Sequence, residues 1–288
     1  MDDTRPRRSL LYLPASNPRA IAKARALACD VVILDLEDSV APEAKEAARA
    51  EAVAAAAAGG WGAREVAIRV NGLSTPWAEA DFRAVAASAA DVLVVPKIAD
   101  AADAARAVAL AGGKPVWPLI ETPQAVLSAA AIAATSGIHG LVAGFADLAK
   151  DLRLKVGRGR EPLFHAMSQI VTAARAAAIL AFDGVFVDIA DTEGLAAEAA
   201  QARAFGFDGK TCIHPSQLAA VNAAFSPAPE EVADARGLLE AHAEAMRQGR
   251  AVATFRGRMV EVLHVVEARR TLALAERLAA TAPEAASG

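Results

Sequence analysis

The stretch VVILDLEDSVAPEAKEAARAEAVAAAAAGG, residues 31–60, holds one complete strand–helix unit. Residues 31–37 begin as a continuous apolar run, which is typical of a strand covered on both faces. The segment 42–58 opens with Pro42 at a first-turn position, is rich in alanine and stops at Gly59-Gly60. A buried strand followed by a helix is the repeating unit of parallel α/β folds.

The same unit recurs along the chain. Most predicted strands start about 22 to 35 residues after the previous one, and a longer gap before the seventh holds the polar stretch KDLRLKVGRGREPL. Helical patterns fill the spaces between them, for example at 99–111 and 123–135. The predicted strands are residues 9–14, 31–37, 66–71, 91–97, 116–121, 140–147, 184–189 and 209–215. Eight such units predict a (β/α)8 TIM barrel, and a chain of 288 residues is long enough for one.

An open doubly wound sheet is the alternative fold. It usually carries a glycine-rich phosphate turn after the first strand, but the turn here reads PASNPR, and neither GxGxxG nor GxxxxGK[ST] occurs. We therefore predict a barrel over residues 1–224 and a C-terminal helical extension or lid over 225–288. The extension contains helical patterns at 226–249 and 259–280, joined by a short hairpin or turn in AVATFRG. The final residues, APEAASG, are expected to be disordered.

Composition excludes several functional classes. The net charge is −4, and Lys and Arg are scattered among Asp and Glu, which argues against a nucleic-acid partner. No apolar run reaches the roughly 18 residues of a membrane span, and the N-terminal MDDTRPRRS lacks the apolar region of a signal peptide. Cys29 and Cys212 match no zinc spacing, so we expect two reduced thiols in a cytoplasmic protein.

Polar residues gather where the predicted strands end, the edge at which barrel enzymes carry their chemistry. Any one of them could instead cap a helix. The set is Asn17, Asp35, Glu37, Asp38, Arg69, Asn71, Lys97, Glu121, Asp147, Asp188, Lys210 and His214.

Glu121 and Asp147 end adjacent predicted strands, so we expect them to be neighbours. Two carboxylates suit Mg²⁺, which often takes one or two protein carboxylates and leaves its other positions to water and substrate. An acid/base pair and two solvated helix caps are the alternatives. Arg69 lies inside the apolar strand AIRVN, where a guanidinium must bind a ligand, such as a carboxylate, or form an internal ion pair with Glu37 or Asp38.

Several long stretches resemble one known family. They are RSLLYLPASNP, DVVILDLEDSVAPEAKEAAR, IRVNGLSTPW, VVPKI, IETPQAV, GFADLAKDL, DGVFVDI, FGFDGKTCIHPSQ and GRMVEVLHVVEARR. In this order, over about residues 8–275, the chain resembles the citrate lyase β-subunit-like (CitE-like) proteins of the HpcH/HpaI aldolase superfamily.

The resemblance implies a (β/α)8 barrel with a C-terminal helical extension, assembled as a homotrimer or hexamer. It implies Mg²⁺-dependent cleavage or formation of a carbon–carbon bond in a 3-hydroxyacyl-CoA such as citramalyl-, malyl- or citryl-CoA. The products would be acetyl-CoA or a related acyl-CoA and a 2-keto acid. By the same resemblance, Glu121 and Asp147 are the metal ligands, Arg69 binds substrate, and Glu37 and Asp38 order metal-bound waters and the arginine.

Further residues are placed by resemblance alone. Lyases with a C-terminal extension supply an acidic residue from a neighbouring subunit, and Glu261 in RMVEVLH stands at that position, where the family has Asp. An exposed glutamate at a helix end is the alternative. Lys210 and His214 in GKTCIHP, and Pro14, are expected near the substrate or CoA, although the GKTCIHP loop could be purely structural. Asn17 and Lys23 are weaker candidates.

Four other functions remain open. Lys97 or Lys210 could form a Schiff base, as in a class I aldolase. The chain could be a citrate lyase β subunit that acts on a thioester of an acyl carrier protein within a complex. It could hydrolyse malyl-CoA as a thioesterase in the same site, or bind ligands without catalysis.

Overall fold

The computed structural model describes residues 5–157, 159–250 and 252–281. It consists of two compact units, Arg7–Phe225 on the one hand and Met1–Pro6 with Ser226–Gly288 on the other. In the described residues, no helix combines the length and the apolar character needed to cross a membrane.

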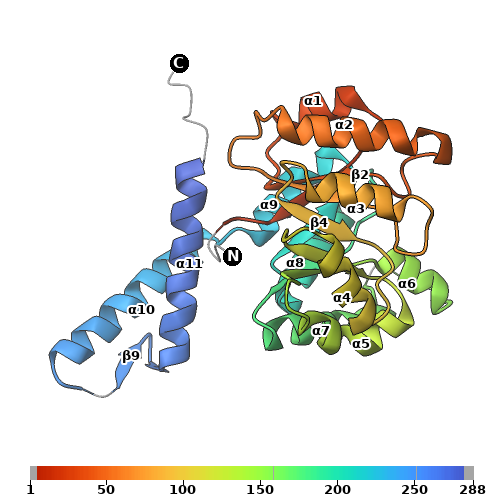
Figure 1. Ribbon diagram of the computed structural model, residues 1–288. Helices are drawn as coiled ribbons and strands as arrows, with labels where there is room; N and C mark the ends of the chain where they lie inside the picture. Colours follow the sequence, from red (N-terminus) through yellow and green to blue (C-terminus); the bar gives the residue numbers. More distant parts are fainter. Residues whose placement is uncertain (1–4, 158, 251, 282–288) are drawn as a thin grey trace. The chain divides into compact units, whose positions relative to one another are not determined.

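The first unit is a closed barrel of eight parallel strands surrounded by helices (Figure 1). Each strand pairs with its sequence neighbours, and β1 closes the barrel against β8, with Ser9 opposite Lys210. The predicted (β/α)8 fold is therefore confirmed. The strands are β1 (Ser9–Pro14), β2 (Val31–Asp35), β3 (Glu65–Arg69), β4 (Val92–Val95), β5 (Val116–Ile120), β6 (Gly140–Ala143), β7 (Leu180–Asp183) and β8 (Gly209–Cys212).

Helices follow the strands in turn, and several begin with the capping residues that their sequences suggest. Thr122 caps α5 and Asp100 caps α4 with side-chain oxygens that accept backbone N–H groups. The α-helices are α1 (Pro18–Ala24), α2 (Lys45–Ala57), α3 (Ala78–Ala86), α4 (Ala101–Leu110), α5 (Pro123–Ala133), α6 (Phe145–Asp151), α7 (Phe164–Ala176), α8 (Thr192–Phe205) and α9 (Leu218–Phe225). Short 3₁₀ turns occur at η1 (Pro42–Ala44), η2 (Glu161–Leu163) and η3 (Pro215–Gln217).

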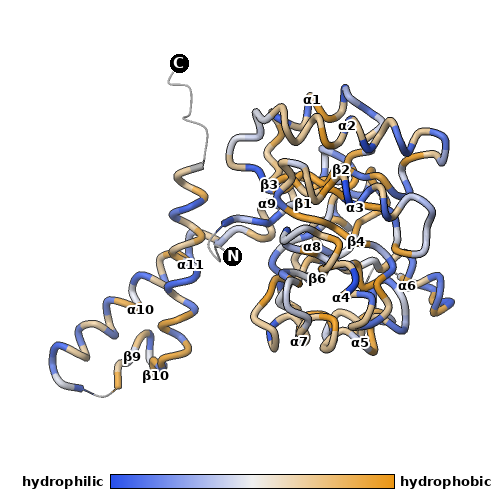
Figure 2. The backbone as a smooth tube through the Cα atoms, viewed as in Figure 1, coloured by the Kyte–Doolittle hydropathy of each residue, from blue (hydrophilic) through white to orange (hydrophobic). Residues whose placement is uncertain are grey.

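The barrel has two apolar layers because successive side chains of a strand point to opposite faces. In β1, Leu10 packs inside the barrel, whereas Leu11 and Leu13 pack against the helices. Figure 2 shows hydrophobic residues concentrated in the strands. The inner cluster consists of Leu10, Val31, Ile33, Ala67, Val92, Val94, Trp117, Leu119, Val142 and Phe182. These side chains fill the barrel interior and form a packed core.

The predicted seventh strand, 184–189, is wrong. β7 is Leu180–Asp183, and the residues after it form the loop that leads to α8. Asp208 fixes β7, since its side chain accepts the backbone N–H of Ala181 at 2.8 Å. Asp188, predicted at the strand end, is instead exposed in the loop and accepts the N–H of Ala190 at 3.1 Å.

The second unit contains α10 (Pro229–Arg247), a hairpin of β9 (Ala253–Phe255) and β10 (Arg258–Val260), and α11 (Val262–Thr281). The predicted hairpin is confirmed. Helices α10 and α11 pack against each other (Figure 1) around a small core that includes Ala245, Ala253, Val260 and Val265. The predicted disorder of APEAASG falls on residues 282–288, outside the described part of the chain.

Candidate active site

A cavity of about 420 Å³ opens at the carboxyl ends of the barrel strands. Inward-facing residues of β1, β2, β3, β5 and β8 form its walls, together with the first turn of α6. The lining residues are Tyr12, Pro14, Asp35, Asp38, Ser39, Arg69, Leu119, Glu121, Ala143, Gly144, Phe145, Ala146, Asp147, Val185, Thr211 and Ile213. The structure thus brings the predicted Arg69, Glu121 and Asp147 together in one cavity.

Arg69 is held by two acidic residues. Its Nε and Nη2 donate to the two carboxylate oxygens of Asp35 at 2.6 and 2.8 Å, and its Nη1 lies 2.9 Å from Oε2 of Glu37. Of the two internal ion pairs considered from the sequence, the one with Glu37 forms, and Asp35 takes the place of Asp38. The guanidinium carries five N–H donors, of which Asp35 accepts two, so each terminal nitrogen still has an N–H for a ligand.

The aromatic ring of Tyr12 supports Arg69 from one face. The guanidinium carbon lies 4.8 Å from the ring centroid, within cation–π range. Burial tends to raise the pKa of Asp35, but the hydrogen bonds and charge of Arg69 outweigh it and lower that pKa below its ordinary value. Asp35 is therefore a fixed anion that orients the arginine.

Glu121 directly follows β5 and is almost completely buried, with 3% of its surface exposed. Its Oε1 accepts the backbone N–H of Lys97 at 2.6 Å. Burial, followed by repulsion from Glu37, raises the pKa of Glu121 to about 7. A buried carboxylate this poorly compensated is a place where a cation would be stabilised.

The side chain of Glu121 passes directly over Gly144. A Cβ atom on Gly144 would lie 2.3 Å from Cβ of Glu121 and 2.8 Å from its Oε2, so no larger residue fits without displacing the glutamate. Glycine at this position lets the β6–α6 turn approach the end of β5.

Asp147 lies in the first turn of α6 rather than in a strand, and 39% of its side chain is exposed. Lys97 extends between the acidic groups, with Nζ 3.4 Å from Oε1 of Glu37 and 3.9 Å from Oδ2 of Asp147. Partial burial would lower the pKa of Lys97, but Glu37 and the other carboxylates raise it overall. A raised pKa works against the Schiff-base alternative, since that nucleophile must be a neutral amine.

Lys97 also has an unusual backbone, with φ of +56°. Non-glycine residues rarely adopt this left-handed conformation. Here it directs the N–H of Lys97 at Glu121 while the side chain reaches Glu37.

Lys210, expected near the ligand, is completely buried on the other face of β8. Its Nζ donates to Asp183 at 2.7 Å, to Glu198 at 2.6 Å and to the carbonyl of Gly184 at 2.6 Å. Arg160 completes this cluster through Asp183 and Glu198. Because Thr211 faces the cavity, the alternation of side chains turns Lys210 toward α8. The structure therefore places Lys210 in the framework of the fold, which corrects the expectation of a ligand contact or a Schiff base.

The remaining predicted residues have different surroundings. Pro14 and Asp38 line the cavity. His214 is exposed and caps η3, where its Nδ1 accepts the N–H of Ser216 at 3.2 Å. Asn17 caps α1 and accepts the N–H of Ala20 at 3.1 Å, and Lys23 is exposed on the same helix. The roles expected for His214, Asn17 and Lys23 remain predictions.

Glu261 belongs to the second unit and immediately precedes α11. Its backbone N–H donates to Nδ1 of His264 at 3.0 Å, and the residue is exposed. Its predicted role as an acid supplied to another subunit remains a prediction.

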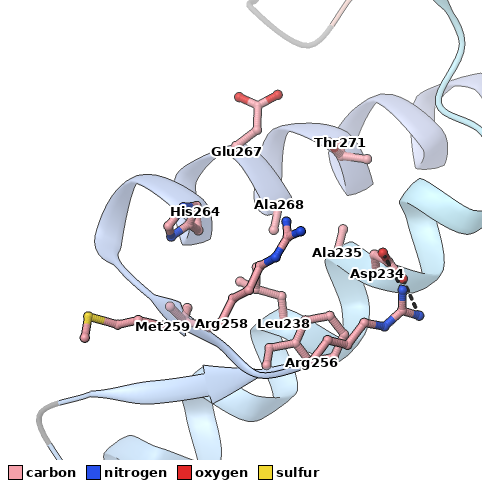
Figure 3. A pocket seen from close by; sticks show the side chains of 12 residues that line it. Asp234, Ala235, Leu238, Arg256, Arg258, Met259, His264, Glu267, Ala268 and Thr271 are labelled. Atoms are coloured by element: carbon pink, nitrogen blue, oxygen red, sulfur yellow. Dashed lines mark hydrogen bonds and ion pairs between the residues drawn. The ribbon is translucent and has the colours of Figure 1, made fainter.

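A second cavity, of about 560 Å³, lies within the second unit between α10, the hairpin and α11 (Figure 3). Asp234 and Arg256 form an exposed ion pair at 2.6 Å there, and Arg258 extends from the hairpin toward α11. Although this cavity is larger, it lacks a buried carboxylate. The barrel cavity is therefore the better candidate for an active site.

Sequence reasoning missed two residues that shape the barrel site, Tyr12 and Lys45, and it named Asp35 as a polar strand end without its pairing with Arg69. Tyr12 and Asp35 position Arg69, as described above. Lys45 is buried and donates to the carbonyl oxygens of Leu36 and Glu37, both at 2.9 Å, which fixes the acidic segment. Pairing of Asp35 with Arg69 follows from their direct opposition across β2 and β3, a register that sequence does not reveal.

Comparison with known proteins gives consistent similarities. The model of the HpcH/HpaI aldolase/citrate lyase family matches residues 8–215. A (3S)-malyl-CoA thioesterase of Cereibacter sphaeroides (strain KD131 / KCTC 12085) is 44% identical over 275 residues, 96% of each chain. An L-malyl-CoA/beta-methylmalyl-CoA lyase of Cereibacter sphaeroides (strain ATCC 17025 / ATH 2.4.3) is 34% identical and covers 96% of each chain. The crystal structure of CitE from Mycobacterium tuberculosis with magnesium, acetoacetate and coenzyme A has a TM-score of 0.79 at 35% identity, covering 95% of this chain and 99% of that one.

Proposed function

The chain belongs to the HpcH/HpaI aldolase/citrate lyase family, and from this premise we propose that it is a Mg²⁺-dependent enzyme acting on a 3-hydroxyacyl-CoA of the malyl-CoA type. We propose hydrolysis of the thioester, to malate and CoA, as the reaction. The observation that carries the proposal is the cavity in which Arg69 faces the carboxylates of Glu121 and Asp147.

The residues present fit a magnesium ion. Glu121 and Asp147 supply two carboxylates, and the raised pKa of Glu121 shows that its negative charge lacks compensation. Oε2 of Glu37 is buried and accepts no hydrogen bond, although Nη1 of Arg69 lies 2.9 Å away. Such an oxygen can accept a hydrogen bond from a metal-bound water.

Each residue of the site has a task in this reaction. When bound, Mg²⁺ would polarise the substrate oxygens as a Lewis acid. Glu121 and Asp147 would hold the ion, and the backbone N–H of Lys97 fixes the Glu121 carboxylate. Arg69 would bind the free carboxylate of the acyl group with its two remaining donors, and Asp35 keeps the guanidinium in the required plane.

Carbon–carbon cleavage to glyoxylate and acetyl-CoA is the second candidate. It is favoured by the similarity to the malyl-CoA lyase, which extends over nearly the whole chain. Hydrolysis is preferred because the similarity to the thioesterase is greater, at 44% against 34% identity. Citramalyl- and citryl-CoA remain further substrates to test, and assembly as a homotrimer or hexamer is part of the proposal.

The products of malyl-CoA distinguish the two reactions. Purified protein with Mg²⁺ should release free CoA thiol and malate, and malate formed in H₂¹⁸O should carry one heavy oxygen by mass spectrometry. Glyoxylate and acetyl-CoA without free thiol would identify a lyase instead. Inactivity toward malyl-, citramalyl- and citryl-CoA would overturn the proposal and favour a thioester carried by an acyl carrier protein. EDTA should stop either reaction.

The pKa of Glu121 predicts how Mg²⁺ stabilises the protein. A pKa of about 7, above the ordinary value of 4.5, means that the contribution of Glu121 to the stability of the metal-free protein falls as pH rises from 4.5 toward 7. The metal binds the deprotonated form, so its apparent affinity should be about 30-fold lower at pH 5.5 than at pH 8. At a fixed Mg²⁺ concentration, the rise in melting temperature should therefore be larger at pH 8.

Thermal melting with Mg²⁺, against KCl of equal ionic strength, checks this prediction. Replacing Glu121 with Gln should remove the difference between the two pH values. An equal shift at pH 5.5 and pH 8 in the unmodified protein would show that Glu121 does not bind the ion.

A further inference from the structure

Tyr12 occupies the floor of the barrel cavity. It lies on the inward face of β1, directly above Leu10, and its ring packs on the inner apolar cluster. The same side chain lines the cavity beside Arg69, Glu121 and Thr211. Its ring thus fills the barrel interior while its hydroxyl lies at the level of the polar residues.

Within the described residues the Tyr12 hydroxyl makes no hydrogen bond, and its oxygen is not among the buried side-chain atoms that lack a partner, so it is open to the cavity. The polar groups around it are engaged: Asp35 with Arg69, Glu121 with the N–H of Lys97, and Thr211 with the carbonyl of Asp183 at 2.9 Å. The hydroxyl is therefore available to a molecule that enters the cavity. Phenylalanine would satisfy the packing equally well, so the hydroxyl indicates a polar group that enters the cavity.

The surroundings of Tyr12 keep its hydroxyl protonated, so it can donate a hydrogen bond. Burial, and then the carboxylates of Asp35 and Glu121, raise the pKa of the phenol against the opposing charge of Arg69. The hydroxyl therefore stays protonated at physiological pH. Arg69 lies over the ring at 4.8 Å, so both residues face the same space. An anionic oxygen is the ligand group that accepts from a phenol and a guanidinium together.

We propose that Tyr12 is a specificity residue whose hydroxyl donates a hydrogen bond to the free carboxylate of the acyl group that Arg69 binds. The inference rests on the proposed binding of a carboxylated acyl-CoA, but it does not depend on which bond of that substrate is broken. It predicts that the site distinguishes carboxylated from uncarboxylated acyl chains of equal length.

Succinyl-CoA and butyryl-CoA are the matched probes, because both carry four-carbon acyl chains and only succinyl-CoA has the carboxylate. Dissociation constants are measured by calorimetry with Mg²⁺ for the unmodified protein and for Tyr12→Phe, which keeps the ring on Arg69. The variant should bind succinyl-CoA about 10- to 100-fold more weakly, the effect of one hydrogen bond to a charged group, and butyryl-CoA unchanged.

A second readout uses the fact that Tyr12 is the only tyrosine of the chain. Biosynthetic 3-fluorotyrosine gives a single ¹⁹F resonance, which should move with succinyl-CoA and stay in place with butyryl-CoA. Equal weakening of both thioesters in Tyr12→Phe would indicate a structural role and overturn the inference. So would an unmodified protein with no preference for succinyl-CoA. Since neither probe requires turnover of malyl-CoA, failure of the proposed reaction is recognised separately.

Discussion

Glu121→Gln is expected to lower Mg²⁺-dependent turnover by about 100- to 1,000-fold while the protein remains folded. Glutamine keeps the size of the side chain and can still accept the N–H of Lys97 through its carbonyl oxygen. It removes the negative charge that would hold the cation. The variant should also be at least as stable as the unmodified metal-free protein at pH 8. At that pH the Glu121 carboxyl group, whose pKa is about 7, is a buried negative charge, and glutamine is neutral.

Steady-state kinetics with malyl-CoA and Mn²⁺ binding by electron paramagnetic resonance measure the two consequences. Asp188→Asn is the matched control. It removes a carboxylate that is exposed in the loop after β7 and accepts the backbone N–H of Ala190. It should change neither turnover nor metal binding. A Glu121→Gln enzyme with normal Mn²⁺ affinity would exclude Glu121 as a metal ligand.

Lys210→Met is expected to lower the free energy of unfolding by about 3–5 kcal/mol. Lys210 is fully buried, and its removal leaves Asp183 and Glu198 with only Arg160 to compensate two carboxylates. Methionine fills much of the same volume, so the loss should come from the uncompensated charge rather than from a cavity. Urea unfolding followed by circular dichroism measures it.

Two variants make the Lys210 result specific. Lys23→Met changes an exposed lysine and should alter stability by less than about 0.5 kcal/mol. Adding Glu198→Gln to Lys210→Met restores the charge balance and should recover part of the loss. If Lys210→Met instead left stability unchanged and raised only the KM for malyl-CoA, the lysine would be a ligand contact as first expected.

The barrel was predictable because most of its strands are buried apolar runs followed by a helix. The seventh strand was misplaced since GVFVDI is as apolar as the true strand segment beside it. Side-chain contacts such as that of Asp208 with Ala181 decide between the two, and these join residues distant in sequence. Local hydrophobicity therefore predicts the number of strands better than their limits.

The polar residues of the candidate site were predictable, but the residues that support them were not. Arg69, Glu121 and Asp147 were recognisable as polar groups at strand ends, and the structure places them in one cavity. The partnership of Asp35 with Arg69 depends on strand register. The burial of Lys210 depends on which face of β8 it occupies. Side chains alternate along a strand, so Lys210 points away from the cavity because its neighbour Thr211 points into it, and the sequence does not show which of the two faces inward.

The close approach of Gly144 to Glu121 bears on the dynamics of metal capture. With the backbone of β6–α6 against one side of the carboxylate and the N–H of Lys97 on the other, Glu121 has little rotational freedom left to lose. In the proposed role of Glu121 as a metal ligand, binding of the cation would require no search among rotamers, because the entropy of ordering this side chain is already lost on folding. Such a preorganised site should exchange its ion at a rate governed by the loss of water from the metal rather than by motion of the protein.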